Sequence, residues 1–244
     1  MNWKYQTGKL LASTELSFIK LNSGFIRRNF PYGRNWLFDI KRILKTPPSV
    51  IIDAGANVGS VSLELNYWFP EAAIYAFEPI QNTFNLLVKQ STGKNNIHPF
   101  CLGLGSQNEE VEILLSSEDT INSLKIKDVR DGIIGKENIT ITRLDDFLQE
   151  RSIPHIDILK IDVEGFEFDV LNGCGSLIND NIKCIYLEVG YERDPTKVHF
   201  SDVEQYMEEK DFMLCGIYET RRSLHDKRKL WYSNNLYIKR SLLT

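Results

Sequence analysis

Acidic residues follow several apolar runs of the sequence, and they are the side chains best suited to chemistry. They are Asp53, Glu78, Asp162, Glu164 and Glu188. A carboxylate accepts hydrogen bonds from ligand ammonium and hydroxyl groups, and it can take a proton from a reacting hydroxyl. If the apolar runs are parallel strands of one sheet, their carboxyl ends meet at one edge, where ligands bind in open α/β sheets. The acids therefore predict a polar ligand site along that edge.

The first apolar run, Val50–Ile52, leads into a glycine turn with the pattern D-x-G-x-N-x-G. A β-branched run of this kind suits a strand buried on both faces. Gly55 lets the backbone approach a ligand closely, and apolar residues at helical spacing follow Gly59. Together they form a cradle for polar ligand groups. The Asp53 carboxylate would repel a pyrophosphate but accept hydrogen bonds from an ammonium group, and the pattern departs from the dinucleotide fingerprint G-x-G-x-x-G.

Three later stretches accompany this turn, namely A-F-E-P at 76–79, L-K-I-D-V-E-G at 159–165 and Y-L-E at 186–188. With these motifs in this order, the chain from Ser49 onwards resembles the class I S-adenosylmethionine-dependent methyltransferases and, more narrowly, the FkbM family. The resemblance implies a seven-stranded, Rossmann-like sheet. Alternating strands and helices also favour a doubly wound, mostly parallel α/β fold. We expect a helical lead-in over residues 1–48 and one methyltransferase domain over 49–244.

Glu78 lies 25 positions after Asp53, close to the gap of about 20 residues between a glycine turn and a ribose-binding acid. We therefore expect its carboxylate to bind the ribose hydroxyls. The resemblance implies S-adenosylmethionine as cofactor, with Asp53 near its amino acid end, directly or through water. It also implies that amides of the turn bind the carboxylate of the donor, and that the loop after the third strand lies near the adenine. The expected donor-binding residues are Asp53, Gly55, Asn57, Gly59, Glu78, Leu102 and Gly103.

The implied reaction is attack of an acceptor hydroxyl on the sulfonium methyl group, with a sugar or secondary-metabolite-like molecule as acceptor. Holding the two groups in line supplies much of the acceleration, and a nearby carboxylate can accept the hydroxyl proton. Asp162 is the first choice for this base or for an acceptor-orienting group, followed by Glu188 and then Glu164. Three converging acids could instead hold Mg²⁺, because hard cations take oxygen ligands. The histidines form no H-x-x-x-H pair, so a histidine metal site is not expected.

Two other functions stay open. The acid after the second strand also fits a nicotinamide-dependent oxidoreductase, although the glycine pattern and Asp53 disfavour it. A non-catalytic nucleoside-binding module would keep the sheet without the chemistry. The acids at the strand ends favour an enzyme over such a module.

A lysine, Lys160, interrupts the apolar run 156–163, which we expect to be a strand. An isolated buried charge is very unfavourable, so Lys160 needs an acidic partner. Asp162, Glu164 or Asp53 on the neighbouring strand could provide it. A structural ion pair and a role in the site are both compatible with this position.

Several further elements follow from periodicity and turn signals. The lead-in should contain helices near 16–20 and over 36–44, and the aromatic turn 30–35 between them is either packing or a lid over the site. A capping box at 201–204 should open a late helix. The charged segment 221–229 is either a solvated loop or a contact for an anionic acceptor. The other expected strands are 73–77, 96–102, 111–115, 139–142, 184–189, 212–218 and 230–239, the last two antiparallel, with a short helix at 144–148.

Bulk properties exclude several classes of protein. The chain has 244 residues, 42% hydrophobic and 25% charged, with a net charge of −4, which is ordinary for a globular domain and argues against a nucleic-acid binder. No apolar stretch approaches the roughly 18 residues of a membrane span, and no signal peptide is evident. The 4 cysteines form no C-x-x-C and should be reduced. We expect a cytoplasmic enzyme, and a homo-oligomer stays open.

Overall fold

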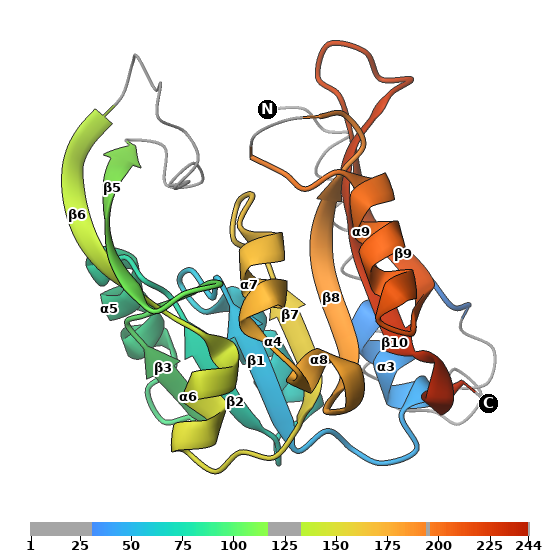
Figure 1. Ribbon diagram of the computed structural model, residues 1–244, viewed down its shortest axis with the longest axis horizontal. Coiled ribbons are helices and arrows are strands. Elements are labelled where there is room, and N and C mark those ends of the chain that lie inside the picture. The colour runs from blue at the N-terminus through green and yellow to red at the C-terminus, as the bar shows by residue number, and fades with distance from the viewer. Residues whose placement is uncertain (1–30, 117–132, 194–195, 244) are drawn as a thin grey trace.

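The computed structural model describes residues 31–116, 133–193 and 196–243, and its centre is a seven-stranded sheet (Figure 1). The strand order is β3-β2-β1-β7-β8-β10-β9. Neighbouring strands from β3 to β8 are parallel, whereas β10 is antiparallel to β8 and β9. The predicted doubly wound, mostly parallel α/β fold is therefore confirmed. The strands are β1 (Val50–Ala54), β2 (Ala73–Phe77), β3 (Ile97–Phe100), β7 (Ile156–Ile161), β8 (Ile182–Gly190), β9 (Phe212–Arg222) and β10 (Leu230–Lys239).

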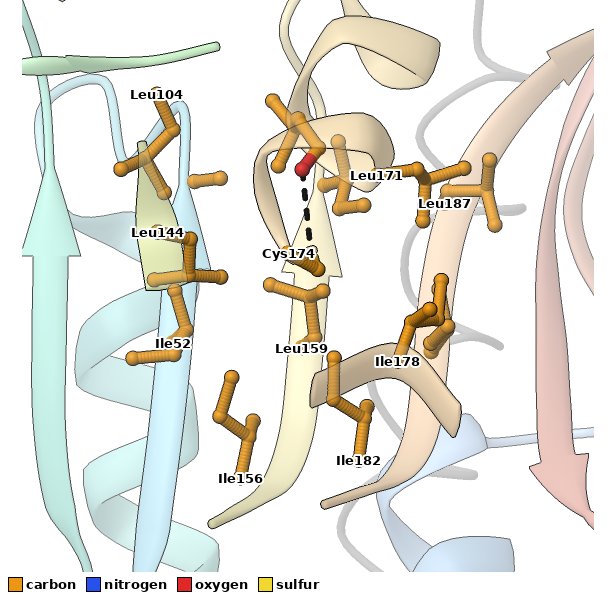
Figure 2. Packing of buried hydrophobic residues seen from close by; sticks show 14 of the residues in the cluster. Ile52, Leu104, Leu144, Ile156, Leu159, Leu171, Cys174, Ile178, Ile182 and Leu187 are labelled. Atoms are coloured by element: carbon orange, nitrogen blue, oxygen red, sulfur yellow. Dashed lines mark hydrogen bonds between the residues drawn. The ribbon is translucent and has the colours of Figure 1, made fainter. Parts of the chain in front are cut away.

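A different set of helices covers each face of this sheet. Successive strand residues point to opposite faces, so neighbours in one strand pack against different helices. Ile52 and Leu159 pack under α6 to α9, and Figure 2 shows this core around them. Ile51 and Ile158 pack under α3 to α5 on the other face. None of the described helices is both long and apolar enough to cross a membrane. The helices are α3 (Trp36–Ile43), α4 (Ser60–Trp68), α5 (Gln81–Gln90), α6 (Leu144–Glu150), α7 (Glu167–Gly173), α8 (Leu177–Asp180), α9 (Phe200–Glu209) and the 3₁₀ turn η1 (Arg240–Leu242).

A small second sheet has the order β4-β6-β5 and extends away from the main sheet (Figure 1). It consists of β4 (Gly103–Leu104), β5 (Glu109–Ser116) and β6 (Ile133–Thr142). Ile113, Ile139 and Ile141 pack together and anchor it on Ile80. The predicted strands 111–115 and 139–142 are confirmed within longer ones. The strand expected over 96–102 is confirmed but shorter, because β3 ends at Phe100 and the chain then joins the second sheet.

The described part of the lead-in contains helix α3, as predicted from its periodicity. Asn35 caps it, with its side-chain oxygen accepting a hydrogen bond from the Phe38 amide. The helix expected near residues 16–20 lies outside the described residues.

The capping box expected at 201–204 is wrong, since α9 already begins at Phe200. His199 is its N-cap, and the His199 ring nitrogen Nδ1 accepts from the Ser201 amide at 3.3 Å. The cap is therefore two residues earlier than the sequence signature indicates. Histidine is outside the preferred N-cap residues, so the pattern gave no sign of it.

Candidate active site

The glycine turn lies at the carboxyl ends of β1 and β2, as expected. The amides of Gly55 and Ala56 both donate to the Phe77 carbonyl, at 3.0 and 2.9 Å, which holds the turn against the end of β2. Gly55, Asn57 and Gly59 all have positive φ, at 74°, 49° and 92°. At Gly55 a side chain is excluded as well, because a Cβ there would lie 1.9 Å from the Asp162 carbonyl oxygen. The turn thus packs directly on the strand end that carries Asp162.

Glu78 joins the two loops that follow β1 and β2. Its carboxylate accepts one hydrogen bond from the Asn57 amide and another from the Ile80 amide, each at 3.0 Å. The side chain is largely buried, and this burial raises the pKa of Glu78 above its ordinary value. The sequence predicts Asn57 and Glu78 in one site, and the two residues are joined by this hydrogen bond.

Lys160 forms a buried ion pair with Asp53, since its ammonium lies 3.0 Å from Asp53 Oδ1. It also donates to the Gly55 carbonyl at 2.7 Å and lies 3.8 Å from Asp162 Oδ2. Burial alone would lower the pKa of Lys160, but the charges of Asp53 and Asp162 hold it above the usual value. Ser62 donates to the other oxygen of Asp53 at 2.5 Å. The structural ion pair considered for Lys160 is therefore present, and it lies directly behind the glycine turn.

The residues after β7 form a tight turn and leave the strand earlier than predicted. The strand expected over 156–163 ends at Ile161, and Glu164 lies in the turn with a φ of 50°. Gly165 follows with a φ of 98°, and its amide donates to Glu167 at 3.0 Å. Asp162 and Glu164 are both partly exposed, with side chains 45% and 36% accessible.

Glu188 lies near the carboxyl end of β8 and is paired with Lys197, which sequence reasoning missed. The Lys197 ammonium also lies 3.7 Å from Glu164 Oε2. Burial raises the pKa of Glu188 to about 7, although Lys197 opposes the shift. Lys197 stands in an aperiodic segment between β8 and α9, so no pattern in the sequence pointed to it. The structure thus brings all three predicted catalytic acids, Asp162, Glu164 and Glu188, to one edge of the sheet.

The family model described as the methyltransferase FkbM domain matches residues 53–214, a range that contains every acid discussed above. The chain belongs to the FkbM methyltransferase family. It is accordingly an S-adenosylmethionine-dependent methyltransferase. Membership of the FkbM family favours methyl transfer over the oxidoreductase and binding-module alternatives that the sequence left open.

Known proteins similar to this FkbM chain include other methyltransferases. It is 25% identical over 239 residues to methyltransferase sdnD of Sordaria araneosa, which covers 84% of this chain and 89% of that protein. It is 30% identical over 152 residues to the 2-O-methyltransferase NoeI of Sinorhizobium fredii, covering 55% of this chain and 60% of that one. The solved METTL16 MTase domain has a similar fold, with a TM-score of 0.50 and 12% identity, over 84% of this chain and 64% of that domain.

Leu102 and Gly103, the residues expected near the adenine, lie on the β3 side of the same edge. A Cβ on Gly103 would be 3.6 Å from Pro79 Cβ, so this segment borders the loop that begins with Glu78. Leu102 is partly buried against the core. The structure therefore groups them with Glu78 and apart from Glu188, which lies on the far side of β7.

The converging acids of this FkbM protein are interleaved with lysines. Lys160 lies between Asp53 and Asp162, and Lys197 lies between Glu188 and Glu164. Over the described ranges, no group of three or more histidine, cysteine or acidic side chains is arranged to hold a metal ion. This interleaving of acids with lysines disfavours the Mg²⁺ alternative.

The lead-in packs on the sheet close to this edge. The Trp36 ring stacks on Tyr186 of β8 with centroids 4.0 Å apart. The buried Asp39 carboxylate accepts from the Tyr218 hydroxyl at 2.8 Å and from the Gly33 amide at 2.7 Å. These contacts fix α3 in place, whereas a lid formed by the turn before it stays a prediction.

Proposed function

We propose that this methyltransferase transfers the methyl group of S-adenosylmethionine to a hydroxyl oxygen of a sugar or secondary-metabolite-like acceptor. The convergence of Asp162, Glu164 and Glu188 beside the glycine turn carries this proposal. A carboxylate near the transferred methyl group suits an oxygen nucleophile, because a hydroxyl must lose its proton during or after attack. The relative NoeI, a 2-O-methyltransferase, supports the same chemistry.

The glycine turn and Glu78 fit the methyl donor. Helix α4 begins after Gly59 without a side-chain cap, so its first-turn amides are suited to the donor's carboxylate. We assign Glu78 to the ribose hydroxyls, because its carboxylate stands at the end of β2 beside Asn57. Leu102 and Gly103 would border the adenine. Asp53 is fully buried and ion-paired, so we assign it to holding the turn, with any contact to the donor running through water.

The bound donor would supply an electrophilic methyl group on a sulfonium sulfur. Asp162 would accept the acceptor's hydroxyl proton as the new oxygen–carbon bond forms and the sulfur–carbon bond breaks. Its partly exposed carboxylate lies next to the glycine turn, whereas Glu188 is engaged with Lys197. We therefore keep Asp162 as first choice for the base, with Glu188 and Glu164 as acceptor-orienting groups. A positioned base of this kind contributes about 10²–10⁴ in rate.

Incubation with methyl-labelled S-adenosylmethionine and fractionated cell extract tests the proposal. We expect a labelled product whose methyl group mass spectrometry places on oxygen. Asp162→Asn should lower labelling by about 10²–10⁴ while calorimetric binding of S-adenosylhomocysteine stays unchanged. Asp180→Asn, a change to an exposed acid on α8, is the matched control and should leave both labelling and binding unchanged.

Methyl groups found on nitrogen or carbon would overturn the O-methylation. Full activity of Asp162→Asn would overturn the assigned base. Failure of the wild-type protein to bind either nucleoside at millimolar concentration would overturn the site as a whole.

A further inference from the structure

Lys197 is a largely buried cation held between two carboxylates of the active-site edge. Its side chain is only 8% exposed, and it is ion-paired with Glu188 and lies 3.7 Å from Glu164 Oε2. The ammonium also lies over the ring of Tyr232, 4.6 Å from its centroid, and 5.8 Å from that of Trp231. Aromatic faces attract a cation and shield it from water. This combination fixes the charge of Lys197 in one place.

The backbone that follows Lys197 is anchored to the end of β8. The Gly190 amide donates to the Val198 carbonyl at 2.8 Å, and Gly190 forms a bridge with His199. The Val198 side chain is buried in the main core. The segment therefore presents Lys197 to Glu188 from a fixed position, in contrast to a long lysine on a free surface loop.

Among the described residues, the charged groups that act most on Glu188 are Lys197, Asp162 and Glu164. Lys197 is the cation of this group, and the other two are acids. On the other side, the register of β8 and β10 places the uncharged Asn234 opposite it. Its own side chain is 12% exposed, so water screens these interactions only in part. Without the lysine, Glu188 would be a largely buried acid beside two other acids.

We propose that Lys197 is a positioning residue for methyl transfer, which keeps Glu188 ionised and directed toward the acceptor. This inference rests on the proposed function, since it assigns Glu188 to the acceptor hydroxyls. An ionised carboxylate only accepts hydrogen bonds, so it would hold hydroxyl groups in a single orientation, whereas a protonated one also donates. Burial already raises the pKa of Glu188 to about 7 with Lys197 in place. Loss of the lysine should raise it further, because an opposite charge within about 4–6 Å favours ionisation.

The direct test is a titration of Glu188 by ¹³C NMR on protein labelled at the glutamate side-chain carboxyl, with Glu188→Gln to assign the signal. We expect the Glu188 midpoint to rise by about one to three pH units in Lys197→Gln and to stay near the wild-type value in Lys197→Arg. Lys183→Gln is the matched control. It removes a lysine that pairs at 2.6 Å with the buried Asp157 at the start of β7, the opposite end of the sheet, and should leave the Glu188 signal unchanged.

The labelling assay adds a functional readout. In Lys197→Gln the acid limb of the pH profile should move upward with the midpoint, so that labelling falls about fivefold or more at pH 7 and recovers at a pH above the shifted midpoint. A merely structural lysine would lower labelling at every pH, and Lys197→Arg would not restore it.

An unchanged Glu188 midpoint in Lys197→Gln would overturn the inference, as would a loss of labelling that does not recover at high pH. The NMR titration needs no acceptor or donor, so it separates this inference from the proposed function. If the midpoint moves but the wild-type protein methylates no hydroxyl, the proposed function fails and the ion-pair effect stands. If labelling is normal and the midpoint stays, only the inference fails.

Discussion

The Lys160 ammonium lies 3.0 Å from the Asp53 carboxylate in the interior of the protein, with side-chain exposures of 4% and 0%. The same ammonium donates to the Gly55 carbonyl, so the ion pair and the glycine turn are one unit. The pair extends across neighbouring strands, because Asp53 and Lys160 are register partners in β1 and β7. The turn that we assign to the methyl donor is thus held from behind by a charge pair.

Replacing Lys160 by methionine should destabilise the fold strongly. The change leaves Asp53 as an uncompensated buried charge, which typically costs about 3–5 kcal/mol. The double variant Asp53→Asn/Lys160→Met removes both charges and should regain a large part of that loss. Urea unfolding of the two variants and the wild type measures the difference. A single variant that loses less than about 1 kcal/mol would show that the pair is not buried as described.

Alanine at Gly55 should disturb the folded structure and donor binding far more than alanine at Gly93. Both glycines have positive φ, at 74° and 81°, so both substitutions carry the left-handed strain of roughly 1–2 kcal/mol. At Gly55 the added Cβ would lie 1.9 Å from the Asp162 backbone oxygen, a neighbour that cannot yield. At Gly93 nothing lies within 4 Å of the added Cβ. We expect Gly93→Ala to unfold slightly earlier with unchanged donor binding. Gly55→Ala should lose donor binding, and equal behaviour of the two variants would contradict this packing.

Much of this architecture was readable from local sequence. Apolar runs such as Val50–Ile52 give strands because parallel strands are buried on both faces, and the acid that follows each run then falls at one edge by topology. The early end of β7 at Ile161 was not predicted, because no side-chain pattern signals the positive φ of Glu164 in the turn that follows. The place of Lys197 in the site could not be predicted from the sequence for a different reason. Its role depends on a contact with Glu188 across an aperiodic loop, and such contacts exist only once the fold has formed.

Glu78→Gln should weaken donor binding. The carboxylate accepts from the Asn57 and Ile80 amides, and the proposed ribose contacts would be further hydrogen bonds to a charged acceptor. Hydrogen bonds to charged groups contribute about 1.5–3 kcal/mol, so we expect the Kd for S-adenosylhomocysteine to rise roughly 10–100-fold. Calorimetry measures this, with Glu71→Gln on the exposed turn before β2 as control. An unchanged Kd in Glu78→Gln would remove Glu78 from the donor site.

Glu167→Gln should stabilise the protein at neutral pH. The Glu167 side chain is buried at the start of α7, where one carboxylate oxygen accepts from the Gly165 amide and the other has no hydrogen-bond partner in the described structure. Burial raises the pKa of Glu167 from 4.5 to about 7. An acid with a raised native pKa binds its proton more tightly in the folded state. Its contribution therefore makes stability fall as pH rises from about 4.5 to about 7.

A glutamine removes this titration and keeps an oxygen for the Gly165 amide. The gain in unfolding free energy over the wild type should therefore be small near pH 4.5 and grow toward pH 7. Urea unfolding across this range measures it, and the comparison at each pH cancels the contribution of Glu188, which titrates in the same window. Glu167 holds the turn that carries Asp162 and Glu164. Because the glutamine oxygen still accepts from the Gly165 amide, the variant should keep this turn and retain methyl transfer. A gain that is constant with pH would show that Glu167 is ionised throughout and that the interior around it tolerates the charge.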